Sequence, residues 1–147
     1  MNLIVKTFEE LSTKELYEIL KSRAEIFVVE QNCVYQDIDD IDLRSLHVFY
    51  QDETGRVVAY LRLFQKTNST DTVQMGRVLT LEHGVGLGGK ILHEGISVAV
   101  AKMSANKIFI EAQTYAIKFY EREGFKVCSE EFLEDGIPHV QMMWDIN

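Results

Sequence analysis

The stretch EHGVGLGGKIL (residues 82–92) contains four glycines within six positions, from Gly84 to Gly89. Glycine lets the backbone curl so that successive N–H groups point at one anion, and a helix that follows such a turn presents its positive end. Four glycines are costly in conformational entropy, which argues for a ligand rather than for a turn without one. This stretch therefore predicts a phosphate-binding turn at the start of a helix.

The spacing of these glycines matches three phosphate-binding patterns. Gly84, Gly86 and Gly89 form the GxGxxG of a dinucleotide-binding loop, and the segment from Gly84 to Lys90 forms the GxxxxGK of a nucleoside-triphosphate loop. From His83 onward, the same letters give a polar residue followed by x-x-G-x-G, the pattern of a coenzyme A-binding loop. The rest of the chain has to decide among the three.

Length and composition narrow the class of protein. The 147 residues suit one domain, residues 1–147, and carry a formal net charge of −8. This acidic balance argues against a nucleic-acid or anionic-membrane partner and favours a cationic one. Cys33 and Cys128 lie far apart, no signal-peptide pattern begins the sequence, and no apolar run approaches the roughly 20 residues that cross a bilayer. We expect a cytoplasmic protein.

The first half of the chain predicts a strand, a helix, a loop and a hairpin. Branched and aromatic residues in LIVKTF (3–8) indicate the strand. Ser12 and Glu15 form a capping box, and the following apolar residues recur at helical spacing. The polar segment VEQNCVYQDIDDIDLRS (29–45) has no clear period and reads as a loop. The hairpin is predicted from LHVFYQ (46–51) and RVVAYLRLF (56–64), joined through Gly55.

The second half alternates strands and helices before two closing strands. After a strand in VQMGRVLTL (73–81), the glycine loop leads into a predicted helix, GGKILHEGISVAVAKM (88–103). KIFIEA (107–112) reads as a short buried strand and YAIKFYERE (115–123) as a helix. The closing strands are expected in FKVCSEEF (125–132) and HVQMMWDI (139–146). This order predicts an α+β fold with a mostly antiparallel sheet.

Two of the three loop patterns conflict with other residues. A nucleoside-triphosphate loop needs a hydroxyl after its lysine to bind magnesium, and Ile91 stands there. The dinucleotide pattern is locally better, because Glu111 ends a predicted strand where a ribose-binding carboxylate would lie. Such folds, however, keep adding parallel strands, whereas this chain flanks one βαβ unit with hairpins. A dinucleotide-binding oxidoreductase domain is therefore the weaker alternative.

Four phrases spread along the chain carry a family resemblance. They are FVVEQNCVYQDIDDID (27–42), MGRVLT (75–80) with HGVGLGGKIL (83–92), EAQTYAIKFYEREGF (111–125) and EDGIPHVQM (134–142). In this order they resemble the GCN5-related N-acetyltransferases (GNAT), and within them the ElaA-type branch. The resemblance implies the family's acyl-CoA N-acyltransferase fold, a mixed and mostly antiparallel sheet flanked by helices. The chain departs from the family pattern at His83, where arginine or glutamine is usual, and in a shortened segment before the glycines.

The resemblance also implies a reaction: direct transfer of an acetyl group from acetyl-CoA, as co-substrate, to a primary amine of a small molecule or a peptide. Backbone N–H groups of residues 85–89 would hold the pyrophosphate, and the strand edge before them would guide the pantetheine arm. We expect the cofactor-binding residues to be Val78, Leu79, Thr80, His83, Gly84, Val85, Gly86, Leu87, Gly88, Gly89, Gln113 and Tyr120.

Tyr120 matches the family's tyrosine that protonates the departing thiolate, a task that suits a phenol with a pKa near 10. Packing in the core is the alternative for this residue, since Ile117 lies on the same helical face. The amine must also lose a proton before it attacks, so a base or a water relay is needed. The candidate bases, each of which has a structural alternative, are Glu30, His47, Glu111 and His139.

The acidic run YQDIDDID (35–42) is either a solvated loop or an attractor for a cationic amine. It lacks the glycine and glutamate of an EF-hand, and the histidines lack zinc spacing, so we expect no metal. Cys33 with His47 as base would allow an acyl-cysteine mechanism, although acidic neighbours disfavour a reactive thiol. A non-catalytic acyl-CoA-binding domain is the second class of function, and a homodimer is possible.

Overall fold

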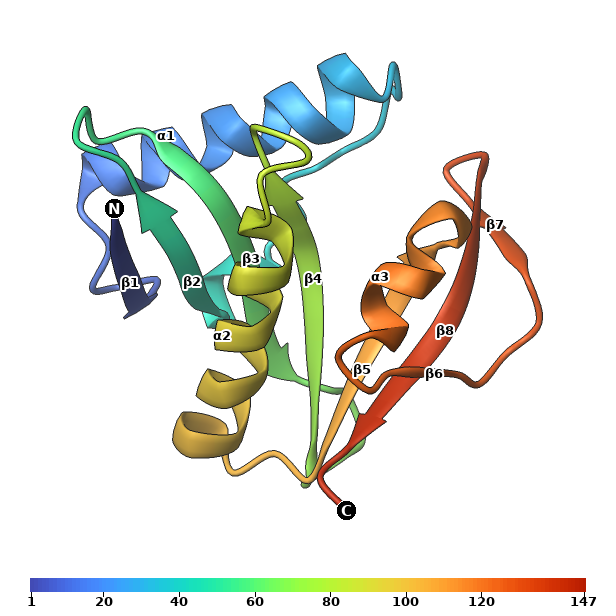
Figure 1. Cartoon of the computed structure of the whole chain (residues 1–147). Coiled ribbons are helices and arrows are strands. Elements are labelled where there is room, and N and C mark those ends of the chain that lie inside the picture. The colour runs from blue at the N-terminus through green and yellow to red at the C-terminus, as the bar shows by residue number, and fades with distance from the viewer.

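The computed structural model describes all residues from 1 to 147 and contains one sheet of eight strands (Figure 1). The strands lie in the order β1-β2-β3-β4-β5-β8-β6, and β7 pairs with β8. Their bounds are β1 (Asn2–Thr7), β2 (Leu46–Gln51), β3 (Val57–Gln65), β4 (Thr72–Thr80), β5 (Lys107–Gln113), β6 (Lys126–Val127), β7 (Phe132–Glu134) and β8 (Ile137–Asp145). The helical segments are α1 (Thr13–Arg23), the π-helical η1 (Ala24–Glu30), the 3₁₀ turns η2 (Ile41–Arg44) and η3 (Thr114–Ala116), α2 (Leu87–Met103) and α3 (Ile117–Glu121).

The neighbouring strands β4 and β5 are parallel and pair at one end only, where Thr72–Gln74 lie beside Lys107–Phe109. Beyond this point the two strands diverge, as Figure 1 shows. A register shift between β3 and β4, where Arg77 has a φ of 51°, adds a bulge and extra twist to β4. The β5-facing edge of β4 therefore keeps unpaired backbone groups as far as Thr80.

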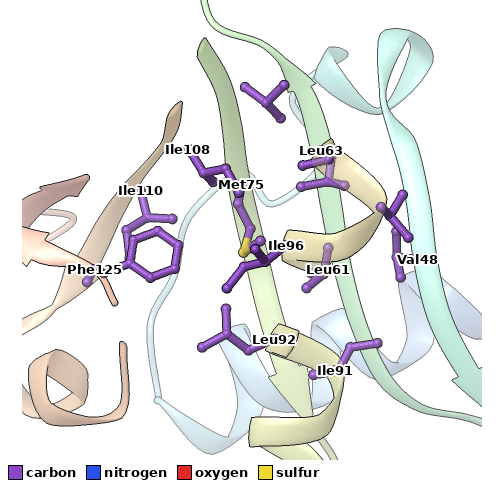
Figure 2. Close-up of a cluster of buried hydrophobic side chains, with 14 of the residues drawn as sticks. Val48, Leu61, Leu63, Met75, Ile91, Leu92, Ile96, Ile108, Ile110 and Phe125 are labelled. Carbon is purple, nitrogen blue, oxygen red and sulfur yellow. The ribbon is translucent and has the colours of Figure 1, made fainter. Parts of the chain in front are cut away.

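Helices α2 and α1 cover opposite faces of the sheet. On the α2 face, Ile91, Leu92 and Ile96 pack into the main core (Figure 2). Strand and loop side chains complete this core with Val48, Leu61, Leu63, Met75, Ile108, Ile110 and Phe125. On the other face, Ile19 of α1 and Ile26 of η1 pack against side chains of β2, β3 and β4. The central strands are thus buried on both sides and hold the divergent ends of β4 and β5 in place.

The structure confirms the predicted α+β fold with its mostly antiparallel sheet, and it confirms the capping box. The Glu15 N–H donates to Ser12 Oγ over 3.0 Å, and the Ser12 N–H donates to Glu15 Oε1 over 2.8 Å. The single strand expected at 125–132 is instead the two short strands β6 and β7. Between them, Ser129 Oγ accepts the Gln141 N–H over 2.8 Å, so a side chain replaces the backbone ladder there.

Three of the four aspartates in the acidic run, Asp37, Asp39 and Asp42, are paired with arginines, and only Asp40 is exposed without an ion pair, which corrects the prediction of a solvated run. Asp37 and Asp42 accept hydrogen bonds from the fully buried Arg23, over 3.0 and 2.6 Å. Arg62 donates to Asp39 over 2.6 Å, and Arg77 donates to Asp37 over 2.7 Å. The three arginines, from α1, β3 and β4, thus hold the loop from 37 to 42 against the helix and the sheet. None of the helices combines the length and apolar composition needed to cross a membrane.

Candidate active site

A cleft of about 550 Å³ opens beside the glycine turn, where the end of β4 faces α3. Gly86 has a φ of 79° and caps α2 without a side-chain hydrogen bond. The first backbone bond of α2 runs from the Lys90 N–H to the Gly86 carbonyl, so the N–H groups of residues 87–89 have no partner within the helix. These free donors at a positive helix end fit the pyrophosphate of an acyl-CoA.

Gly88 lines this cleft opposite Phe119, and a Cβ at this position would stand 3.3 Å from the Phe119 ring. We expect Gly88→Val to weaken acetyl-CoA binding at least about tenfold, since the branched side chain fills the space above the donor N–H groups. Gly89→Ala is the matched control: its Cβ meets nothing within 4 Å and its N–H is kept. Calorimetric titration of both variants with acetyl-CoA checks this, and equal affinity of the two would contradict it.

His83 and Glu30 meet at the outer end of this cleft. His83 Nε2 lies 3.0 Å from Glu30 Oε1, and both side chains are largely exposed. Glu30 therefore stands beside the glycine turn and does not line the second cavity described below, and its role as a base stays a prediction. The Val85 side chain is 58% exposed and turns toward a neighbouring hollow, so only its backbone faces the predicted phosphate site.

A second cavity of about 500 Å³ adjoins the cleft on the side of β5 and β8. The two share their lining at Phe27, Gln31, Val78, Tyr115, Ala116 and Tyr120. Tyr120 packs edge-on against Phe119 and Phe125, with ring centroids 5.0 and 5.7 Å away. Its hydroxyl makes no hydrogen bond within the protein, and burial raises its pKa. The phenol is thus a protonated, uncommitted donor at the junction of the two spaces.

His139 and Glu111 line the second cavity, which we call the acceptor cavity. His139 is 7% exposed, and its Nδ1 lies 2.7 Å from the Ile137 carbonyl. A carbonyl only accepts, so Nδ1 carries a proton, and Nε2 keeps a lone pair when the ring is neutral. Nε2 has no hydrogen-bond partner and lies 3.6 Å from Glu134 Oε2. Burial, and next the charge of Glu134, raise the pKa of Glu111.

His47 is buried away from both spaces, which corrects its assignment as a candidate base. Its Nδ1 lies 2.7 Å from the Tyr60 hydroxyl and its Nε2 lies 3.0 Å from the Asp42 carbonyl. Desolvation lowers its pKa, so it is a neutral core residue. The Cys33 thiol lies near the Asp135 carbonyl instead, which leaves the acyl-cysteine mechanism without its base.

Gln113 lines the acceptor cavity and not the cleft beside the glycine turn, and its contact with the cofactor stays a prediction. Its amide pairs with that of Gln31, with N···O distances of 3.2 and 3.4 Å, and so links β5 to the segment after η1. Gln31 and Glu134 border the cavity but were not predicted as site residues. Both stand inside the resemblance phrases, yet a loop glutamine and a hairpin glutamate have no spacing that marks a site.

Comparison with known proteins gives the family. Residues 6–146 match the family model described as an acetyltransferase (GNAT) domain. A UPF0039 protein of Schizosaccharomyces pombe is 38% identical over 149 residues, covering 99% of this chain and 98% of that protein. Escherichia coli ElaA is 34% identical over 143 residues, covering 93% of this chain and 92% of that protein.

Comparison with solved structures also gives acyltransferases of this family. The crystal structure of Escherichia coli ElaA superposes with a TM-score of 0.91 over 99% of this chain and 100% of that one. An acyl-CoA N-acyltransferase from Pseudomonas aeruginosa is 34% identical, with a TM-score of 0.90 over 98% of this chain and 99% of that one. The chain belongs to the GNAT acetyltransferase family and is an ElaA-like member of it.

Proposed function

We propose that this protein transfers an acetyl group from acetyl-CoA directly to a primary amine. The observation that carries the proposal is the junction at Tyr120, a side chain that borders both the cofactor cleft and the acceptor cavity. One substrate on each side of this junction would bring a thioester and an amine together without a covalent enzyme intermediate. Such positioning supplies several kcal/mol of barrier lowering in bimolecular reactions. The name of the Pseudomonas aeruginosa relative supports an acyl-CoA donor.

In the proposed reaction, Nε2 of His139 takes a proton from the ammonium of the acceptor. The neutral amine then attacks the thioester carbonyl, so that a C–N bond forms and the C–S bond breaks. The departing thiolate takes the proton of the Tyr120 hydroxyl. The nitrogen, cationic after the attack, gives up its second proton, which restores the phenol of Tyr120 and leaves a neutral amide. His139 is the better base of the two that line the cavity, because its free lone pair is set by the bond from Nδ1 to the Ile137 carbonyl.

Thermal unfolding with acetyl-CoA, CoA, NADH and magnesium ATP in parallel tests the donor. A ligand at about 100 times its Kd stabilises the folded state by about 2.7 kcal/mol. We expect a raised melting temperature with acetyl-CoA and CoA. A rise with NADH alone would overturn the proposal and favour the dinucleotide alternative. If neither acetyl-CoA nor CoA raised the melting temperature, acetyl-CoA could not be the acetyl donor of this protein.

For the base, we expect His139→Gln to lower kcat/KM about a hundredfold. His93→Gln is the matched control, because His93 is 71% exposed on α2. Steady-state kinetics with acetyl-CoA and a primary amine check both variants. A kcat/KM that His139→Gln leaves unchanged would show that the base lies elsewhere.

A further inference from the structure

Arg62 of β3 borders the acceptor cavity with one hydrogen-bond donor unused. Its side chain is only 3% exposed. One terminal nitrogen donates to Asp39 over 2.8 Å and to Asp42 over 3.0 Å, and the other donates to Asp39 over 2.6 Å. Nε is buried as well, but it has no hydrogen-bond partner. A buried donor without a partner is costly unless a ligand or a water molecule completes it.

Gly76 keeps the space beside this donor open. It stands opposite Arg62 in the pairing of β3 with β4, and it also lines the cavity. A Cβ at Gly76 would lie 3.9 Å from Arg62 Nε and would meet no other atom within 4 Å outside its chain neighbours. The Nε–H group is therefore approached from the cavity over Gly76, which is where an oxygen atom of a ligand would lie.

This donor carries no free positive charge, because the guanidinium is already balanced. Arg62 pairs with Asp39 and Asp42, and Arg77, the other arginine of the lining, pairs with Asp37. The other ionisable groups of the lining that are charged or titrate near neutral pH are Glu111, Glu134, Asp135 and His139. Arg62 Nε therefore suits the oxygen of a neutral carbonyl group better than a carboxylate, which would meet acidic side chains in the same space.

Gln74 supplies a complementary polar group. It lies two residues before Gly76 and so on the same face of β4. It lines the cavity, and its side-chain amide makes no hydrogen bond to the protein. Long side chains at diagonal positions of two paired strands are within reach of each other. A donor on Arg62 and an acceptor oxygen on Gln74 together match an amide group, whose carbonyl accepts and whose N–H donates.

The junction with the cofactor cleft lies a short way along the same strand. Val78 of β4 lines both spaces and stands two residues beyond Gly76, which is about 6–7 Å along a strand. We propose that the acceptor is an amine that carries a neutral amide group about this distance from its nitrogen. Arg62 Nε donates to the carbonyl of this amide, and Gln74 accepts its N–H. The inference rests on the proposed function, because the amine would lie at the junction beside Tyr120.

Three acceptors of matched length test the group at the far end: ω-aminopentanamide, n-hexylamine and ω-aminopentanoate. Their far ends are an amide, an alkyl group and a carboxylate. With wild-type protein and saturating acetyl-CoA, we expect kcat/KM to be about tenfold higher for the amide than for hexylamine, because only the amide completes the buried donor. The carboxylate should be poorer than the amide by at least about fivefold, because it adds a like charge to an acidic lining.

A peptide and a small amino amide present the same group, so a second pair of acceptors separates these two sources. Glycylglycinamide has its terminal amide at the same chain position as ω-aminopentanamide, and glycylglycine has a carboxylate there. If the amide is preferred in this pair too, peptides belong to the acceptor class. If the preference is confined to the alkyl series, the class is small amino amides. A preference for the amide in neither series would overturn the inference.

Gly76→Ala tests Arg62 without removing it, since an Arg62 variant would also break the ion pairs with Asp39 and Asp42. Gly76 has no positive φ, so alanine fits the backbone, and the added Cβ fills the space that the carbonyl oxygen needs. We expect the preference for the amide over hexylamine to fall from about tenfold to less than about twofold. A preference that survives this substitution, even with lower rates for both acceptors, would overturn the role of Arg62.

Gln74→Met keeps the length of the side chain and removes its amide. We expect this variant to lower the preference for the amide about threefold. Gln141→Met is the matched control, because Gln141 is a half-buried residue of β8 that does not line the cavity. The control should keep the full preference, and an equal preference in the two variants would overturn the role of Gln74.

The outcomes separate this inference from the proposed function. Equal turnover of the amide, alkyl and carboxylate acceptors would overturn the recognition of an amide and leave acetyl transfer intact. Turnover of none of the acceptors by protein that binds acetyl-CoA would also overturn the inferred class. Protein that fails to bind acetyl-CoA would instead overturn the proposed function.

Discussion

Tyr120→Phe should lower kcat by a factor of about 10² to 10³, the range of a lost general acid, while the Kd for acetyl-CoA changes by less than about twofold. The substitution removes only the hydroxyl, which has no hydrogen bond to the protein. The ring keeps its edge-on packing against Phe119 and Phe125. Burial raises the pKa of this phenol, so it stays protonated through neutral and mildly alkaline pH.

Steady-state kinetics and acetyl-CoA titration on the same samples check this prediction. Tyr17→Phe is the control, since Tyr17 lies on α1 and is 67% exposed. A Tyr120→Phe protein that keeps nearly full turnover would show that another group protonates the thiolate. Equal losses in turnover and in affinity would show instead that Tyr120 shapes the cleft rather than acting as the acid.

Arg23→Met should lower the free energy of unfolding by about 3–5 kcal/mol. Arg23 is fully buried and lies 3.0 Å from Asp37 and 2.6 Å from Asp42. Its removal leaves buried carboxylates short of a counter-charge, in a cluster where Asp42 Oδ2 already has no hydrogen-bond partner. The melting temperature should fall by about 10 °C or more. Lys21→Met is the control, because the Lys21 side chain is 53% exposed and its pair with Glu18 should contribute less than about 1 kcal/mol.

The pH dependence of this stability gives a second readout. Burial alone would raise the pKa of Asp42, but the hydrogen bond and charge of Arg23 outweigh it and hold the pKa below its usual value. A carboxyl with a depressed pKa in the folded state stabilises that state above its unfolded pKa of about 4 and loses this contribution as the pH falls. Urea unfolding from neutral pH to about pH 3 should show a steeper loss for wild type than for Arg23→Met. Parallel curves would contradict the ion-pair account.

Local patterns in the sequence predicted much of the fold. The capping box at Ser12 and Glu15, the hairpin around Gly55 and the glycine turn before α2 each depend on neighbouring residues, and each is present. The divergence of β4 and β5 could not be predicted, because it depends on a pairing that stops at Gln74 and on a bulge opposite β3. The hydrophobic periodicity of a strand does not report which neighbour the strand pairs with or where that pairing stops.

The part of the site formed by a single loop could be predicted from the sequence, whereas the part formed by distant segments could not. The glycine turn was recognised from the spacing of its own glycines. His47 and His139 are equivalent as sequence letters, and only the fold buries one in the core and places the other beside a cavity. The arginine cluster joins residues 40 positions apart, as in the bond from Arg77 to Asp37, so its aspartates read as a solvated run. Charge pairing of this kind needs the tertiary structure.

Mass spectrometry of a reaction between acetyl-CoA and a primary amine tests the central claim most directly. The protein should form an N-acetylated amine and free CoA in equal amounts, with no acetylated protein intermediate and with a rate that falls sharply for Tyr120→Phe. A protein that binds acetyl-CoA but yields no N-acetyl product with any amine would contradict this account, and it would identify the chain as an acyl-CoA-binding domain without turnover.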